Sequence, residues 1–203
     1  MSNYHHVETW LFYGISDLYF SFHSEEWVFD YHSAFFAIMA LEKHFKAFLI
    51  WHRRQEFEGL GVSEAQNKVL EIAKEYSHNF TTMAKKANEY MPNNEIDAFL
   101  QKNHDGYNGG ELLKVLRDAY METRYPTKEC VSLKFPVGEP GVFHNPLGSS
   151  GLHKFIQGLC EMLAIELSDR VEFNKLLGEV KQQYKHLEPF NRFSNIYLNG
   201  YWQ

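Results

Sequence analysis

The stretch that decides the fold is AFFAIMALEKHFKAFL, residues 34–49. Its first eight residues are apolar on every side, and a helix of that kind packs in the middle of a bundle. Its second half is amphipathic, with Leu41, Phe45 and Phe48 at helical spacing on the inward face. We therefore expect residues 26–52 to form the central helix of a bundle. The cations predicted to face outward on this helix are Lys43, Lys46, Arg53 and Arg54.

Helical periods recur on both sides of this stretch. Apolar residues at steps of three and four predict helices over 7–22, 64–91 and 111–124. Pro92 ends the second of these helices and Pro126 ends the third, because proline cannot continue a helix. Between the two, the segment EIDAFLQK predicts a short helical piece and NHDGYNGG predicts a loop.

The chain changes character over 127–150, where prolines and glycines interrupt short apolar runs. This pattern predicts a loop excursion or a two-stranded hairpin. Residues 151–203 are expected to add C-terminal helices and an aromatic tail, with these helices packed on the outside of the bundle. The predicted fold is therefore all-α, a single domain over 1–203. It is an up-and-down bundle of four to five main helices whose core covers 7–126.

The composition excludes several classes of protein. The net charge of −6, from 20 Lys+Arg against 26 Asp+Glu, disfavours wide binding to a phosphate backbone, which needs many cations on one face. Cys130 and Cys160 lie in no C-x-x-C motif, so neither a disulfide framework nor a cysteine zinc site is expected. No stretch approaches the ~18 apolar residues of a membrane span, and MSNYHHVETW is unlike a signal peptide. We therefore expect a cytoplasmic protein without a membrane segment.

The standard catalytic and metal-binding motifs are absent from the sequence. It contains no phosphate-binding G-x-x-x-x-G-K-[ST] loop, no complete dinucleotide fingerprint and no H-E-x-x-H. One E-x-x-H motif occurs, from Glu75 to His78, whereas a di-iron bundle needs two such motifs and two further glutamates. The sequence therefore predicts neither a metal site nor a cofactor.

Three short phrases, in order along the chain, carry a family resemblance. The first lies on the predicted central helix, the second on the predicted helix 64–91, and the third at the end of the predicted helix 111–124. Together they resemble the HEPN family (higher eukaryotes and prokaryotes nucleotide-binding domain) over about 16–128. The phrases are Ala40-Leu41-Glu42-Lys43 with Lys46-Ala47, then His78-Asn79-Phe80, and then Tyr120 with Arg124-Tyr125-Pro126.

This resemblance implies a site that binds a nucleotide, a nucleic-acid phosphate or a protein partner. It also implies a toxin–antitoxin or nucleotidyltransferase association, with a nucleotidyltransferase-type protein as candidate partner. A structural interpretation of each phrase stays open. Glu42 and Lys46 are also spaced for an ion pair on a helix surface, and His78 is also compatible with an ordinary histidine within a helix. The third phrase is also typical of a helix end. The implied binding residues are Lys43, Lys46, His78, Tyr120, Arg124 and Tyr125.

The sequence departs from the family at its catalytic motif. Ribonuclease members of the family place a His four to six residues after an Arg on a late helix, where His moves a proton and Arg stabilises phosphate charge. None of the six arginines of this chain is followed by such a His. We therefore expect a binding protein without nuclease activity. The alternatives are a structural or partner-binding bundle, and a metal-independent endoribonuclease that uses the non-standard pair His78 and Arg124.

A homodimer is also expected. Aromatic residues make up 16% of the chain, more than the core of a domain of this length obviously needs. Surplus apolar surface commonly marks an interface, and two-fold pairing is the commonest way to cover it.

Overall fold

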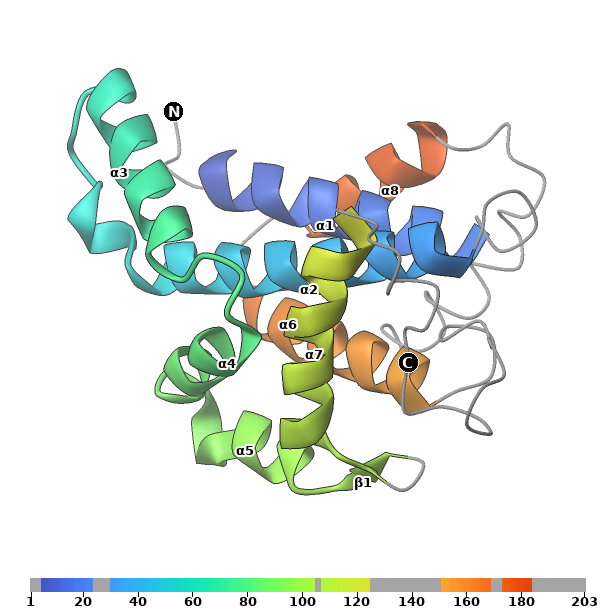
Figure 1. Ribbon diagram of the computed structural model, residues 1–203. Helices are drawn as coiled ribbons and strands as arrows, with labels where there is room; N and C mark the ends of the chain where they lie inside the picture. The colour runs from blue at the N-terminus through green and yellow to red at the C-terminus, as the bar shows by residue number, and fades with distance from the viewer. Residues whose placement is uncertain (1–4, 24–29, 105–106, 125–150, 169–172, 184–203) are drawn as a thin grey trace.

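The computed structural model describes residues 5–23, 30–104, 107–124, 151–168 and 173–183, and the prediction of an all-α bundle is confirmed (Figure 1). None of the helices described is long and apolar enough to cross a membrane. The elements are α1 His5–His23, α2 Asp30–His52, η2 Arg54–Glu56, α3 Val62–Glu75, α4 Phe80–Asn88, η3 Pro92–Asn94, α5 Glu95–Leu100, β1 Asn103–His104, β2 Tyr107–Asn108, α6 Gly109–Arg124, α7 Gly151–Ser168 and α8 Phe173–Gln183.

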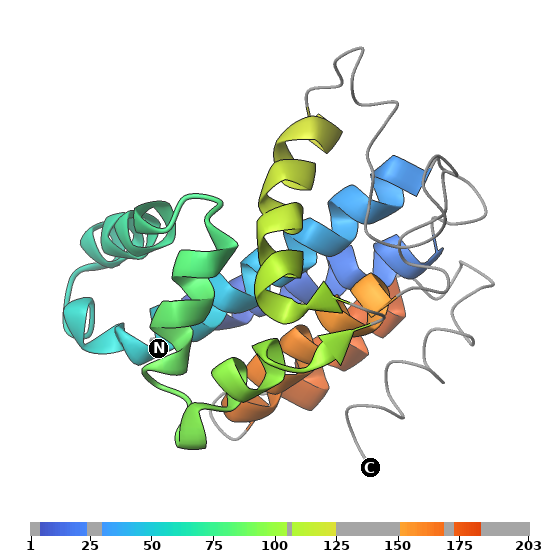
Figure 2. The same cartoon turned by 60° about the horizontal axis from the view of Figure 1, so that its bottom comes forward.

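Helix α2 is the centre of the bundle, as its sequence predicts. Between Ala37 and Trp51, every residue except Met39 and Lys43 is buried. Helices α1, α3, α4, α6 and α7 all pack against it. In Figure 1, α1 lies alongside α2 and α6 crosses it, while Figure 2 shows α6 and α7 on different sides of α2. Because the surface of α2 is apolar on every side, other helices pack against it on several sides.

The prediction of one long helix over 64–91 is wrong, because the chain breaks between α3 and α4. Ser77 has a positive φ of 50°, which an α-helix does not accommodate. Asn79 then caps α4, its side-chain oxygen accepting a hydrogen bond from the backbone N–H of Thr82 at 3.1 Å. The apolar period continues across the break because each shorter helix has a buried stripe of its own. Periodicity alone therefore missed the turn.

Helix α7 differs from the prediction that the C-terminal helices lie outside the bundle. Phe155, Leu159 and Leu163 of α7 are fully buried, and α7 packs directly on α2. Helix α7 covers a side of α2 that the N-terminal helices leave open, so it belongs to the core. Helix α8 packs on α1 and keeps Lys175 and Glu179 exposed.

The strands also differ from the prediction. The segment predicted as a loop contains β1 and β2, which pair antiparallel with Asn103 opposite Asn108. The hairpin predicted within 127–150 lies outside the described residues, as does the aromatic tail predicted from Pro189.

The buried position of α7 can be tested by truncating one of its core side chains. Leu163→Ala is expected to lower the free energy of unfolding by about 2–5 kcal/mol, because the core cannot refill the cavity. Ile165→Ala on the same helix is the matched control, since Ile165 is 51% exposed and its loss should cost less than ~0.5 kcal/mol. Urea unfolding measures both variants. Equal effects of the two substitutions would contradict the placement of α7.

His44 is a buried polar residue at the contact between α1 and α2. Its side chain is fully buried, and its Nδ1–H donates to the Ala40 carbonyl oxygen at 2.8 Å. A Cβ on Gly14 of α1 would lie only 2.9 Å from His44 Nδ1, so the glycine permits this close approach. Burial lowers the pKa of His44 from 6.5 to about 4. The folded protein therefore holds this imidazole neutral.

This pKa predicts a specific loss of stability in acid. As the pH falls from about 6.5 to about 4, the unfolded chain binds a proton at His44 and the folded chain does not. The free energy of unfolding should fall over this window by roughly 3 kcal/mol from this group alone. His44→Asn keeps an N–H donor but does not titrate, so chemical denaturation across the window should give a shallower pH dependence. An unchanged dependence would show that His44 titrates normally.

Candidate functional site

Four side chains form a continuous chain of polar contacts, which we call the Glu42 cluster: Lys46, Glu42, His78 and Tyr120. The Lys46 ammonium donates to Glu42 Oε1. Glu42 Oε2 accepts from His78 Nδ1–H at 3.0 Å, because an ionised carboxylate can only accept. The other ring nitrogen, His78 Nε2, lies at hydrogen-bond distance from the Tyr120 hydroxyl, 3.1 Å away.

The cluster is assembled from three separate parts of the chain. Glu42 and Lys46 lie one turn apart on α2, His78 lies in the turn between α3 and α4, and Tyr120 lies on α6. The His78 and Tyr120 rings stack, with centroids 4.0 Å apart and planes inclined by 24°. The break after α3 places His78 beside Glu42, because in an unbroken helix residue 78 would continue along the axis of α3.

The cluster is closed to solvent except at His78. The side chains of Glu42 and Lys46 are only 4% and 8% exposed, and Tyr120 is buried, whereas the His78 side chain is 37% exposed. The prediction that Lys46 faces outward is therefore wrong. Helix α1 covers this side of α2, and the Lys46 ammonium lies 5.5 Å from the centroid of the Trp10 ring. The predicted pairing of Lys46 with Glu42 exists, but as a buried ion pair.

Lys43 has a different partner and is not part of the cluster. Its ammonium pairs with the Asp17 carboxylate of α1 and lies 5.7 Å from the centroid of the Tyr13 ring. Burial raises the pKa of Asp17 above its ordinary value, and the hydrogen bond from Lys43 acts in the opposite direction. The charge of Lys43 is therefore balanced across the contact between α1 and α2.

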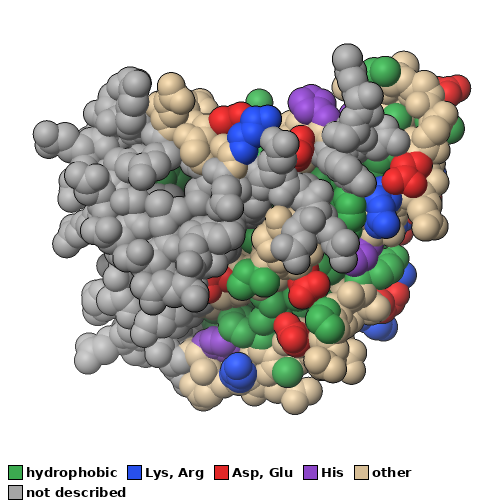
Figure 3. Space-filling view, turned by 180° about the vertical axis from the view of Figure 1, so that it is seen from behind, with side chains coloured by type: hydrophobic (Ala, Val, Ile, Leu, Met, Phe, Trp, Pro, Cys, Tyr) green, Lys and Arg blue, Asp and Glu red, His purple; other side chains and the backbone are tan. Residues whose placement is uncertain are grey.

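The two arginines after α2 also have carboxylate partners. Arg53 bonds Glu56 and Glu75, and the hydrogen bond with Glu56 raises the pKa of Arg53 above its ordinary value. Arg54 Nε lies 3.7 Å from Glu58 Oε1. On the face seen in Figure 3, Lys and Arg side chains of the described part are scattered among acidic ones rather than gathered.

The E-x-x-H motif does not act as a unit. Glu75 pairs with Arg53, whereas His78 contacts Glu42. Within the described ranges, no group of three or more His, Cys, Asp or Glu side chains is placed to hold a metal ion.

Arg124 and Tyr125 complete the predicted site residues. Arg124 is the last residue of α6, one turn beyond Tyr120. Its side chain, and the whole of Tyr125, lie outside the described residues. Of the six predicted residues, the structure therefore brings together Lys46, His78 and Tyr120.

Sequence reasoning missed the central role of Glu42. It treated this residue only as the helical partner of Lys46, although its carboxylate joins Lys46 to His78. The available signal was an acidic residue inside a stretch that is otherwise apolar and basic. An acid in such a place needs a buried partner, because an unpaired buried charge is costly.

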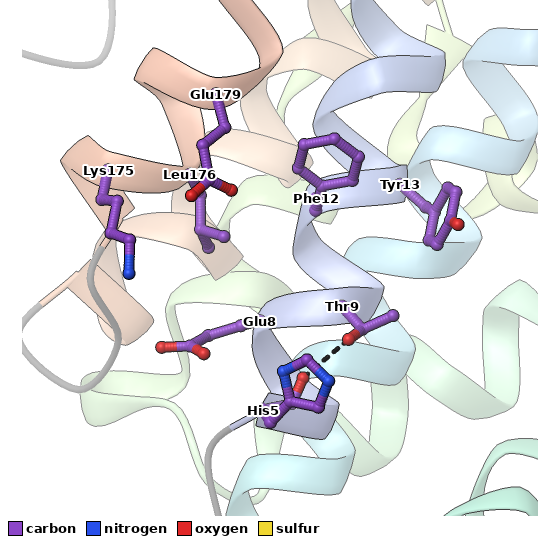
Figure 4. A pocket seen from close by; sticks show the side chains of 8 residues that line it. All are labelled: His5, Glu8, Thr9, Phe12, Tyr13, Lys175, Leu176 and Glu179. Atoms are coloured by element: carbon purple, nitrogen blue, oxygen red, sulfur yellow. Dashed lines mark hydrogen bonds between the residues drawn. The ribbon is translucent and has the colours of Figure 1, made fainter. Parts of the chain in front are cut away.

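A separate groove of about 420 Å³ lies between α1 and α8 (Figure 4). Phe12 and Leu176 form its apolar part, and Glu8, Glu179 and Lys175 approach it from the two helices. It contains none of the predicted site residues.

Comparison with known proteins adds no relative. No protein-family model, curated protein or solved structure matches the chain. The resemblance to the HEPN family therefore stays a prediction that rests on the residues quoted above.

The buried ion pair of the cluster gives a stability prediction. Glu42→Gln keeps most of the shape but leaves the Lys46 charge buried without its counter-ion, which should cost about 3–5 kcal/mol in urea unfolding. Adding Lys46→Met removes the second charge and should recover much of that loss. The matched control, Lys86→Met, breaks the exposed pair with Glu89 and should cost under ~1 kcal/mol. A Glu42→Gln effect no larger than this control would contradict the buried pair.

Proposed function

We propose that this chain is a HEPN-like helical protein that acts by binding a protein partner and does not cleave RNA. The first support is spatial. The three phrases behind the family resemblance lie far apart in the sequence, yet a residue from each meets in the Glu42 cluster: Glu42, His78 and Tyr120. An accidental likeness of sequence gives no reason for these residues to contact one another.

The observation that carries the non-catalytic assignment is that both ring nitrogens of His78 have hydrogen-bond partners within the protein. Its Nδ1 bonds Glu42 and its Nε2 bonds the Tyr120 hydroxyl, so both nitrogens are engaged within the protein. A general base in RNA cleavage needs a ring nitrogen within hydrogen-bond reach of the 2′-hydroxyl. Here the tyrosine hydroxyl occupies that position.

The charges favour a protein partner over a phosphate. Lys43 and Lys46, the cations that the resemblance assigns to a nucleotide or nucleic-acid phosphate, are paired with Asp17 and Glu42. A phosphate would have to displace a carboxylate from each of them, and Lys46 would also have to leave a buried position. A nucleotidyltransferase-type protein, which the resemblance suggests, is the candidate partner.

The proposal predicts no ribonuclease activity. Labelled single-stranded RNA incubated with the protein and EDTA should remain intact, and His78→Ala should behave like the parent. A positioned general base is worth about 10²–10⁴ in rate, so the assay has ample range. Metal-independent cleavage that is abolished by both His78→Ala and Arg124→Ala would instead establish the nuclease alternative.

The same preparation separates a phosphate ligand from a protein partner. Mononucleotides and short RNA should leave the melting temperature unchanged, because the Lys43 and Lys46 charges are already paired. Co-expression with a nucleotidyltransferase-type protein encoded beside this chain should give a complex of fixed stoichiometry. A nucleotide-dependent rise in melting temperature that Lys46→Met removes would replace this proposal with phosphate binding.

A further inference from the structure

The groove between α1 and α8 has the size and the apolar surface of a small-molecule site (Figure 4). Its volume of about 420 Å³ lies within the ~300–1,000 Å³ of pockets that hold small molecules. Phe12 of α1 is half-buried and Leu176 of α8 is buried, and both line the groove. The groove therefore offers apolar contact to the body of a ligand, at the place where two helices pack together.

Two carboxylates come from opposite walls of this groove. Glu8 lies on α1 and Glu179 on α8, and in Figure 4 both side chains extend into the space between the two helices. Neither carboxylate has an ion pair or a hydrogen bond with any other described residue. The acids Asp17 and Glu42, by contrast, each pair with a lysine. The groove therefore has acceptor oxygens that a bound molecule can use.

The charges that line the groove have a negative balance. Among its described lining residues, the single ammonium of Lys175 stands against the carboxylates of Glu8 and Glu179. The chain as a whole has a net charge of −6, which acts in the same direction. One further positive charge balances the groove. A ligand with one cationic group is therefore favoured over a neutral or an anionic one.

We propose that this groove binds a small organic molecule that carries one primary ammonium group on an apolar body, of the arylalkylammonium class. A primary ammonium has three N–H donors, which match the acceptor oxygens of Glu8 and Glu179. The apolar body then lies against Phe12 and Leu176, where its burial removes apolar surface from water.

The aromatic residues of the groove favour a primary over a quaternary ammonium. The Phe12 ring offers one face to a cation. The Tyr13 ring is already engaged, because the Lys43 ammonium lies 5.7 Å from its centroid. Quaternary ammonium groups are held by cages of several aromatic rings, which Phe12 alone does not form. Carboxylate acceptors therefore dominate recognition here, and they require N–H donors.

The groove is independent of the proposed function. Its lining comes from α1 and α8, whereas the Glu42 cluster is built from α2, α6 and the turn before α4. The two sites share no residue. Failure of amine binding therefore leaves the protein-partner proposal untouched, and failure of the partner leaves the groove untouched.

Titration of the ¹⁵N-labelled full chain with 2-phenylethylammonium, followed by NMR, tests the proposal. Saturable binding is expected with a dissociation constant on the order of 1 mM or lower, because a ligand of this size gains little beyond the cost of association. The amide shifts should centre on residues 8–13 and 175–180. Phenylacetate, which has the opposite charge, and the N,N,N-trimethyl derivative, which has no N–H donor, should both bind more weakly.

Charge-neutralising variants test the two acids. Glu8→Gln and Glu179→Gln should each weaken binding of 2-phenylethylammonium about two- to fivefold, and the double variant about tenfold. Glu95→Gln is the matched control, because Glu95 is an exposed acid on α5 without an ion pair among the described residues, and it should change nothing. Circular dichroism checks that each variant is folded.

Four results would overturn the proposal. They are the absence of saturable binding at millimolar concentration, binding of phenylacetate as strong as that of the amine, amide shifts centred outside α1 and α8, and a folded double variant that binds like the parent. Weaker binding at higher NaCl concentration would support it, because salt screens the attraction between the ammonium and the carboxylates.

Discussion

The structure depends on the burial of α2 on every side. A helix with an apolar surface all round must be covered by several neighbours, so α1, α4, α6 and α7 are held in contact with one axis. The polar residues in the middle of α2 are buried with the rest of it. Each must find a partner inside the bundle, and Glu42 finds two of them, Lys46 and His78. The polar cluster is thus a consequence of the same burial that organises the fold.

Features that depend on interactions between neighbouring residues could be predicted from the sequence, whereas contacts between distant parts of the chain could not. The all-α class, the central place of α2 and the bounds of α1 and α6 follow from local periodicity, which a single helix records in its own residues. The break at Ser77 escaped prediction because the apolar period of α3 continues in phase into α4. Ser77 and Asn79 were its local signals, and each also occurs inside helices.

The residues of the candidate site were predicted only in part, because their contacts join distant parts of the chain. His78 and Tyr120 were identified because three short phrases, taken together and in order along the chain, resemble one family. Their contact was not predicted, since it depends on the turn that redirects the chain before α4. Lys46 was placed on the surface because a lysine that follows a glutamate by four residues normally lies there. Only the packing of α1 over that side of α2 shows otherwise.

The place of α7 in the core has a consequence for synthesis of the chain. Helix α2 ends at His52, but α7, the last of the described helices that packs closely on it, ends at Ser168. At about 5–20 residues per second, a ribosome needs on the order of 10 s to make the chain between them. During that interval an apolar surface of α2 stays uncovered by its final neighbour, and such surfaces are where nascent chains aggregate or recruit chaperones. Truncation before α7 should leave the N-terminal helices insoluble rather than merely less stable.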